Sequence, residues 1–312
     1  MLRVISRRLI SLPFVLLAVT FLTFIVGYLA PGDPILNLMG NRRDPVIYER
    51  LRDLYGLNLP WYQQYLNYLG GLLQGNFGLS FRYAQRPVMD LISSGIGVSI
   101  VLGLGALFLS LIVGIPSGLY AALHKDKVSD RLLMAVMLSL FAIPSFVLIP
   151  VLRWANFQAY SAGLPSLPAA GWGRPEHWIL PMIVLSAASL GLIARITRAS
   201  MVEVLNEDYI RTAYAKGLTE GMVRWRHAFR NALLPIVTVI GPSVAFLVTG
   251  AFVVENLFSI PGIGFLSVTA IQQRDYPVIQ ATTVILAVSV VIVNLVVDLL
   301  YTILDPRVRV DS

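Results

Sequence analysis

The sequence predicts an all-α membrane protein with six transmembrane helices and both termini in the cytoplasm. Of its 312 residues, 56% are hydrophobic and only 13% are charged, whereas soluble domains carry about a quarter charged residues. Six apolar stretches approach or exceed the roughly 20 residues that a helix needs to cross the bilayer core. These stretches are Leu9 to Ala30, Val98 to Leu123, Leu132 to Leu152, Trp178 to Ile196, Leu233 to Val254 and Val278 to Leu304.

The positive charges predict the orientation of these spans. With the N-terminus inside, the cytoplasmic pieces are residues 1–8, 124–131, 195–232 and 305–312, which hold 15 of the 24 lysines and arginines. Six of the other nine lie in the long stretch 31–97, and loops of that length report orientation poorly. Among short loops the ratio is 15 to 3. The net charge of +7 therefore reflects topology, and we expect no nucleic-acid partner.

The first span begins after Arg3, Arg7 and Arg8, as a secretory signal would. Its apolar run, however, exceeds the 7–15 residues of a signal core. Pro31 directly follows Ala30, where a cleavage site would have to lie, and proline there is unfavourable. The sequence therefore predicts an uncleaved anchor.

Helical signals continue in the first outer segment, residues 31–97. Asp44-Pro45 predicts a helix N-cap with proline at the first helical position, and Pro60 begins a second helix rich in aromatic residues. This external platform either lies at the level of the lipid headgroups or packs on the bundle as a small cap.

A ridge of small residues follows the second span at every fourth position: Ala106, Ser110, Gly114, Gly118 and Ala122. Such a ridge lets another helix approach closely, either as fixed packing or as a moving interface. Several spans also contain prolines, namely Pro13, Pro116, Pro144, Pro150, Pro181 and Pro242. Neighbouring helices and waters satisfy the freed backbone groups in membrane bundles, so the prolines do not argue against the spans.

One face of the sixth span carries Asn294, Asp298, Tyr301 and Asp305. A carboxylate within a span suggests a proton or ion relay. Asp298 lies within two turns of the cytoplasmic end, however, where it can reach water or pair with an arginine. We favour this second interpretation.

Several kinds of chemistry have no residues to support them. The chain has no cysteine, no lysine followed by Ser or Thr, and three histidines (His124, His177 and His227) that are too far apart for a helical metal pair. We therefore expect no cofactor, no metal and no catalysis in this chain. The energy for any active transport would come from another protein.

The segment between the fourth and fifth spans is the most informative. Tyr209 to Lys216 has helical composition, and Gly217 supplies a stop. A basic helix ended by glycine would lie beneath the bundle. A solvated positive loop is the alternative on these residues alone.

Two runs in this segment, Arg211-Thr212-Ala213-Tyr214-Ala215-Lys216-Gly217-Leu218 and His227-Ala228-Phe229-Arg230-Asn231-Ala232-Leu233-Leu234-Pro235, resemble the coupling loop of ATP-binding-cassette (ABC) importers. They depart from the generic form, because Arg211-Thr212 replace Glu-Ala and Gly217 lies farther from Leu234-Pro235. The departure is typical of the peptide and nickel branch.

Further matches occur in order along the chain: Pro31 to Pro34, Tyr55 to Pro60, Gly75 to Ser80, Glu255 to Gly264 and Asp305 to Arg307. Together they are similar to the B-type permease subunit of bacterial oligopeptide and dipeptide ABC importers. The resemblance implies the type I ABC importer permease fold in the bacterial cytoplasmic (inner) membrane. It implies residues 1–30 as tip and first span, 31–97 as platform, 98–304 as permease core with coupling loop 199–232, and 305–312 as tail.

The resemblance also implies the partners: a homologous second permease, two ABC ATPase subunits that bind ATP and Mg, and an extracytoplasmic substrate-binding protein. The ATPase-coupling residues would be Tyr209, Ile210, Arg211, Thr212, Ala213, Lys216, Gly217 and Leu218, with Ala213 allowing close approach. The binding protein would dock on Trp61, Tyr62, Tyr65, Phe77 and Tyr83. The same machinery carrying nickel, glutathione or another small solute is an alternative. An ion-coupled secondary transporter and an intramembrane enzyme are rivals from other classes.

Overall fold

The computed structural model describes residues 2–39, 44–83 and 86–304. Every regular element within these ranges is a helix, so the predicted all-α class is confirmed. The side chains of Asp298 and Tyr301 and all of residues 305–312 lie outside the described residues. The interpretation of the sixth-span face therefore stays a prediction.

Five long helices coincide with predicted spans. They are α1 (Leu2–Leu29), α5 (Val88–Leu123), α8 (Glu176–Leu205), α11 (Arg230–Leu257) and α13 (Tyr276–Leu304). Among the described residues, four of these (α1, α5, α8 and α13) contain a stretch long and apolar enough to cross a membrane. Prolines lie inside α1, α5, α8 and α11 without ending them, as expected for a membrane bundle.

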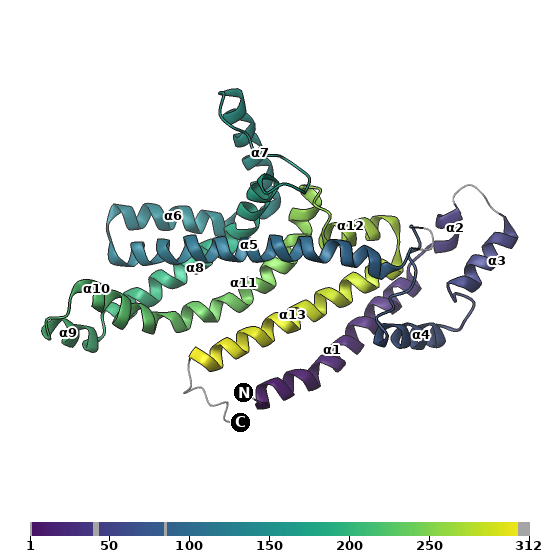
Figure 1. Cartoon of the computed structure of the whole chain (residues 1–312), viewed down its shortest axis with the longest axis horizontal. Helices are drawn as coiled ribbons and strands as arrows, with labels where there is room; N and C mark the ends of the chain where they lie inside the picture. The colour runs from purple at the N-terminus through teal and green to yellow at the C-terminus, as the bar shows by residue number, and fades with distance from the viewer. Residues whose placement is uncertain (1, 40–43, 84–85, 305–312) are drawn as a thin grey trace.

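The third predicted span, Leu132 to Leu152, is not one continuous helix. The structure divides it into α6 (Val128–Ala142) and α7 (Ser145–Ser161), which are bent by 116°. Pro144 explains the break, because proline disfavours helical geometry in the residue before it. Ile143 is accordingly extended, with φ −79° and ψ 120°. Figure 1 shows α7 leaving the bundle at this point. Counted as one broken span, the pair raises the number of candidate spans to five.

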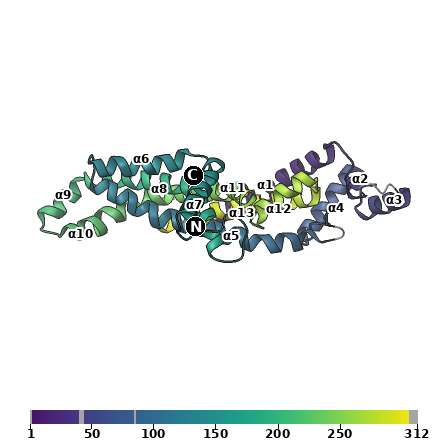
Figure 2. The ribbon, with the colours of Figure 1, turned by 90° about the horizontal axis from the view of Figure 1, so that it is seen from above.

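The platform contains three short helices: α2 (Pro34–Met39), α3 (Pro45–Leu54) and α4 (Trp61–Leu73). They lie at one end of the molecule, opposite α9 (Asp208–Ala215) and α10 (Glu220–Met222) (Figures 1 and 2). The local signals are confirmed. The Asp44 carboxylate accepts a hydrogen bond from the amide of Val46 at 2.8 Å, and α4 begins directly after Pro60.

The platform is attached to the bundle by hydrogen bonds. The buried carboxylate of Asp275 accepts hydrogen bonds from the Ser80 hydroxyl and from the amides of Phe81 at 3.0 Å and Arg82 at 3.3 Å. Ser80 is the last residue of the Gly75 to Ser80 run noted in the sequence, and Phe81 and Arg82 follow it. The loop before α13 therefore holds the end of the platform through one carboxylate.

The close approach predicted for the small-residue ridge is confirmed, because all five of its members are buried. The ridge lies against α8. A Cβ added at Gly114 would lie 3.0 Å from the carbonyl oxygen of Leu190, and one added at Gly118 would meet the carbonyl of Ala194. Only residues without a larger side chain let the two backbones come this close. The main core adjoins this contact, with members from α5, α7, α8 and α11.

Candidate functional site

The candidate site is the segment 199–232, which forms the end of the molecule farthest from the platform (Figure 1). It holds the last turns of α8, then α9, α10, a π-helix (Val223–Phe229) and the start of α11. The residue after the Lys216 C-cap is Gly217, with φ +77°. Because only glycine adopts this conformation without strain, the chain leaves α9 here, as the sequence predicts.

The inner face of α9 is fixed to the rest of the chain. Ile210 is 1% exposed and Ala213 is 6% exposed. They pack in a cluster, here called the α9 cluster, whose other buried members are Ala122, Met201, Val223, Ala228 and Ala232. Leu218 packs against its edge. The small side chain of Ala213 therefore allows a close approach to the chain's own helices.

The outer face of α9 is open. Tyr209, Arg211, Thr212, Tyr214 and Lys216 are all exposed. Arg211 pairs with Asp208 at 3.3 Å, but their side chains are 76% and 93% exposed, so this pair contributes little stability. Arg211 is therefore free to exchange Asp208 for another acceptor. Tyr209 is held in place, since its hydroxyl accepts a hydrogen bond from the Asn231 amide at 2.8 Å.

The chain returns toward α11 through a π-helix of seven residues. Extended π-helical turns are rare and are frequently found at functional sites. This one exposes Trp225, whose ring meets Phe229 edge-on at 5.3 Å between centroids. Val223 and Ala228 turn inward to the α9 cluster. The π-helix and α9 therefore pack in the same hydrophobic cluster.

An ion pair joins α6 to α8 near this end of the molecule. Asp130 is 1% exposed, and its two carboxylate oxygens accept hydrogen bonds from the Arg198 guanidinium at 2.7 and 2.6 Å. The Asp126 amide donates a third bond at 3.0 Å. Sequence reasoning missed this pair because 68 residues separate its members. It fixes the start of α6 against α8 just before α8 enters the segment.

Glu255 is a further buried carboxylate, and it orders the contact between α5, α11 and α12 (Ile263–Gln273). Glu255, near the end of α11, accepts hydrogen bonds from the Ser99 hydroxyl at 2.6 Å and from the amides of Gly264 at 2.7 Å and Phe265 at 3.2 Å. The two amides belong to the first turn of α12. Ser99 in turn accepts a bond from the Ile263 amide at 2.8 Å. The amides of Ile263, Gly264 and Phe265 at the start of α12 thus all donate to side chains, one to Ser99 of α5 and two to Glu255 of α11.

This arrangement explains part of the Glu255 to Gly264 run noted in the sequence. A Cβ added at Gly262 would collide with the Glu255 carboxylate, whereas one added at Gly264 would lie 2.5 Å from the Cα of Phe252 in α11 and 2.9 Å from that carboxylate. Gly262 therefore leaves room for the carboxylate, and Gly264 also lets the start of α12 approach the backbone of α11.

Comparison with protein families decides the class of this chain. Residues 114–310 match the model described as "Binding-protein-dependent transport system inner membrane component", and residues 1–95 match the model of the N-terminal part of such membrane components. The chain belongs to this family. It is thus a multi-pass membrane permease component of an ABC importer, a type of subunit that is generally non-catalytic.

Two related permeases align with almost the full length of this chain. The glutathione transport system permease protein GsiC of Escherichia coli K12 is 39% identical over 309 residues, which cover 99% of both chains. The dipeptide transport system permease protein DppB of Bacillus subtilis 168 is also 39% identical, over 99% of this chain and 98% of its own length.

Solved structures agree on the fold. A chain of the MetNI methionine ABC transporter, in an inward-facing conformation, superposes with a TM-score of 0.58 and covers 70% of the permease and 97% of its own length. A chain of an amino acid ABC transporter gives 0.52 over 68% and 94%. Both are 16% identical to the permease, so they establish the fold alone.

The predicted docking residues of the permease divide into two groups. Trp61, Tyr62 and Tyr83 are between 41% and 50% exposed on the platform. Tyr65 instead packs on α1, with its hydroxyl 3.2 Å from that of Thr20. Phe77 packs against a cluster formed by α5, α12 and α13. Aromatic composition alone did not distinguish outward from inward residues.

Proposed function

We propose that this permease is one of two homologous permease subunits of an importer for short peptides. Two ABC ATPase subunits, which bind the ATP and Mg, drive it from the cytoplasm, and an extracytoplasmic binding protein delivers the substrate. The family supports the importer class, and the names of two relatives, for glutathione and dipeptides, support the substrate class. Both names denote peptides, since glutathione is a modified tripeptide. The family assignment argues against an ion-coupled secondary transporter.

The proposed topology has six spans, with α6 and α7 as one broken span and both termini in the cytoplasm. The 15-to-3 distribution of lysine and arginine over the short loops supports this orientation. The platform and α9 lie at opposite ends of the molecule, as one outer and one inner surface require (Figure 1).

The observation that carries the mechanism is the two-sided packing of α9. Its exposed face, with Arg211, Thr212, Tyr214 and Lys216, would sit in a groove of one ATPase. Its buried face shares the α9 cluster with Ala122 of α5, Met201 of α8 and Ala232 of α11. When ATP closes the ATPase pair, movement of α9 would pass to three long helices at once. Such rigid-body rocking converts the permease between inward- and outward-facing states.

Replacing Gly217 with valine is expected to abolish peptide uptake and transport-coupled ATP hydrolysis while the protein still inserts and assembles. No heavy atom beyond the two neighbouring residues lies within 4 Å of an added Cβ, so the change acts mainly through the backbone conformation. A β-branched residue at φ +77° costs about 1–3 kcal/mol and would redirect the chain leaving α9. Uptake of a labelled dipeptide into proteoliposomes and ATPase rate measure the effect.

Gly221→Val is the matched control, because Gly221 also has nothing within 4 Å of an added Cβ but has no positive φ. It should transport normally. Normal uptake and ATP hydrolysis in the Gly217 variant would refute the coupling role of α9.

Binding-protein docking is proposed for the exposed aromatics of the platform, Trp61, Tyr62 and Tyr83. Replacing Trp61 with alanine should weaken binding of the binding protein to the reconstituted importer by about tenfold or more, because exposed tryptophans are common interface hot spots. Trp225→Ala is the control, since Trp225 is 61% exposed at the opposite end. Equal affinities of the two variants, measured by surface plasmon resonance, would count against the platform as docking surface.

A further inference from the structure

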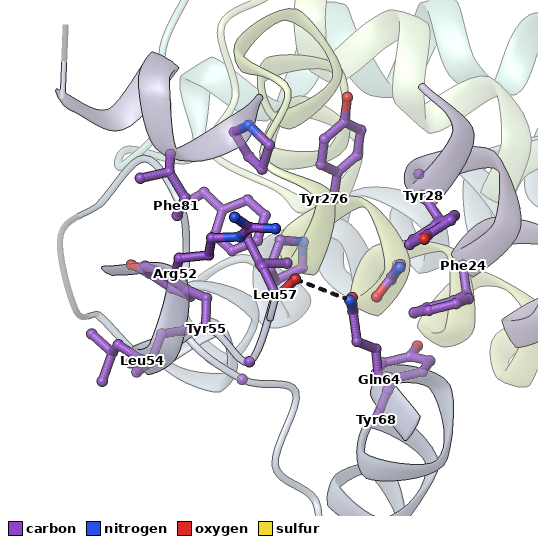
Figure 3. Close-up of a pocket in the computed structure, with 18 of the residues that line it drawn as sticks. Phe24, Tyr28, Arg52, Leu54, Tyr55, Leu57, Gln64, Tyr68, Phe81 and Tyr276 are labelled. Carbon is purple, nitrogen blue, oxygen red and sulfur yellow. Dashed lines mark hydrogen bonds between the residues drawn. The ribbon is translucent and has the colours of Figure 1, made fainter. Parts of the chain in front are cut away.

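A cavity of about 590 Å³ lies between the platform and the bundle. Its walls come from the last turns of α1, the start of α13, helices α3 and α4, and the loop around Phe81. Figure 3 shows Arg52 on one side of it and Phe24, Tyr28 and Tyr276 on the other. The volume lies in the range of sites that hold small ligands, about 300–1,000 Å³.

Aromatic rings form most of the apolar wall. Phe24 and Tyr28 stack at 6.2 Å between centroids, and Phe81 meets Tyr276 edge-on at 6.4 Å. Tyr55 packs on the other side of Phe81 at 4.8 Å. Such a wall suits a ligand with an aliphatic part as well as a polar part.

Two of the polar groups that remain free in the cavity, on Arg52 and Tyr68, are donors. The Arg52 guanidinium makes no hydrogen bond or ion pair with any residue that the structure describes, although it lines the cavity. The Tyr68 hydroxyl is buried there, also without a partner among the described residues. Burial raises the pKa of the Tyr68 phenol, so this hydroxyl stays protonated and can donate.

Asp33 is the acidic residue of the lining, and its oxygens are already used. One accepts hydrogen bonds from the amides of Ile35 at 2.8 Å and Leu36 at 3.4 Å, and the other accepts one from the Tyr48 hydroxyl at 2.6 Å. Asp33 keeps its negative charge, but these three donors occupy its oxygens. Arg52 is therefore the charged group of the lining whose hydrogen-bonding capacity is free, and a phosphate oxygen is the acceptor that suits it.

The position of the cavity indicates where that anion comes from. The apolar stretch of α1 ends at Leu29 and that of α13 begins at Tyr276, so both spans end at the cavity. In the proposed orientation this is the headgroup layer of the outer leaflet, just outside the hydrocarbon core. Along α1, Phe14, Leu22 and Val26 are between 62% and 69% exposed, as expected for a surface that faces lipid.

We propose that this cavity binds one anionic phospholipid of the outer leaflet. The phosphate accepts hydrogen bonds from Arg52, and the Tyr68 hydroxyl donates to the head group. The glycerol and the first methylene groups lie against Phe24, Tyr28 and Tyr276. The lipid fills the space between platform and spans, and thereby supports the surface proposed to receive the binding protein. The inference uses the orientation, and not the substrate, of the proposed function.

The test uses the complete importer in nanodiscs of phosphatidylcholine with a small fraction of phosphatidylglycerol, and native mass spectrometry to count the phosphatidylglycerol retained. Arg52→Gln should weaken retention by about tenfold, the loss of one charge-assisted bond. Tyr68→Phe should weaken it less and preserves the shape of the wall. Arg50→Gln is the matched control, because Arg50 is exposed on the same helix, and it should retain the lipid as the unmodified importer does.

Competition separates the lipid from other anions. Inorganic phosphate or a soluble acidic peptide at millimolar concentration should not displace phosphatidylglycerol. Displacement by either, or equal retention in the Arg52→Gln and Arg50→Gln variants, would overturn the proposal. Peptide uptake measured in the same particles keeps the two proposals apart. An importer that retains the lipid but takes up no peptide would contradict the proposed transport function and not the lipid site.

Discussion

Replacing Asp130 with alanine is expected to lower the stability of the permease by about 1.5–3 kcal/mol, because the change removes the charge-assisted hydrogen bonds to Arg198, whose side chain is 29% exposed and is left to water. The pair is bidentate, and Asp130 is 1% exposed. Thermal unfolding of the purified importer, followed by size-exclusion chromatography after heating, measures the loss. We also expect uptake to fall, since the pair fixes α6 to α8 beside the α9 cluster.

Arg195→Ala is the matched control for this prediction. Arg195 lies one turn from Arg198 on α8 but is exposed, so its removal should change stability by less than about 0.5 kcal/mol. The double variant Asp130→Leu with Arg198→Met should recover much of the stability, since an apolar pair of similar volume often replaces a buried ion pair well. A single Asp130→Ala variant as stable as Arg195→Ala would show that the pair is not important.

Replacing Glu255 with alanine should also be destabilising. The Ser99 hydroxyl and the amides of Gly264 and Phe265 would lose their acceptor. Each buried polar group left unsatisfied costs about 1–3 kcal/mol, so a total of several kcal/mol is expected. Glu255→Gln should cost less, because an amide keeps the volume and one acceptor oxygen. The order Ala, Gln, Glu of increasing thermal stability is the expected result.

Protease accessibility near α12 is the second measurement. Cleavage after Arg274, at the end of α12, should rise in the Glu255→Ala variant if the carboxylate holds the start of that helix. Asn256→Ala changes the neighbouring residue of α11 and serves as control. Alanine and glutamine variants with the unmodified stability and cleavage pattern would contradict the role assigned to Glu255.

Much of the helical framework could be predicted from the sequence, because surfaces that face lipid must be apolar over a whole span. Long hydrophobic runs therefore located α1, α5, α8, α11 and α13. Helix caps and helix-ending glycines could also be predicted, because they depend only on neighbouring residues. Asp44 caps the helix beside it, and Gly217 has the left-handed conformation that its place after a helix suggested.

The break at Pro144 could not be predicted in the same way. Pro116 and Pro181 lie inside helices that continue through them, whereas the chain bends by 116° at Pro144. Whether a proline kinks a span or ends it depends on the neighbours that satisfy the freed backbone groups. Those neighbours are set by the tertiary structure.

The buried polar contacts were also beyond the sequence. Asp130 and Arg198 are 68 residues apart, and Ser99 and Glu255 are 156 residues apart. No local pattern predicts which distant residues will meet. The same limit applied to single faces of short helices. Composition marked Tyr209 to Leu218 as one group, and only the fold separates the inward Ile210 and Ala213 from the outward Arg211 and Lys216.

Helix α5 has 36 residues and so extends about 54 Å, well beyond the thickness of a hydrocarbon core. Val88 at its start lies in the cluster that receives Phe77 of the platform, and Ala122 at its end lies in the α9 cluster. The two extremities of the permease are thus joined by one uninterrupted piece of backbone. We therefore expect binding of a partner at the platform end to be thermodynamically linked to binding of a partner at the α9 end. If a bound ATPase changes the affinity of the platform for the binding protein by some factor, then a bound binding protein must change the affinity of the α9 end for the ATPase by the same factor.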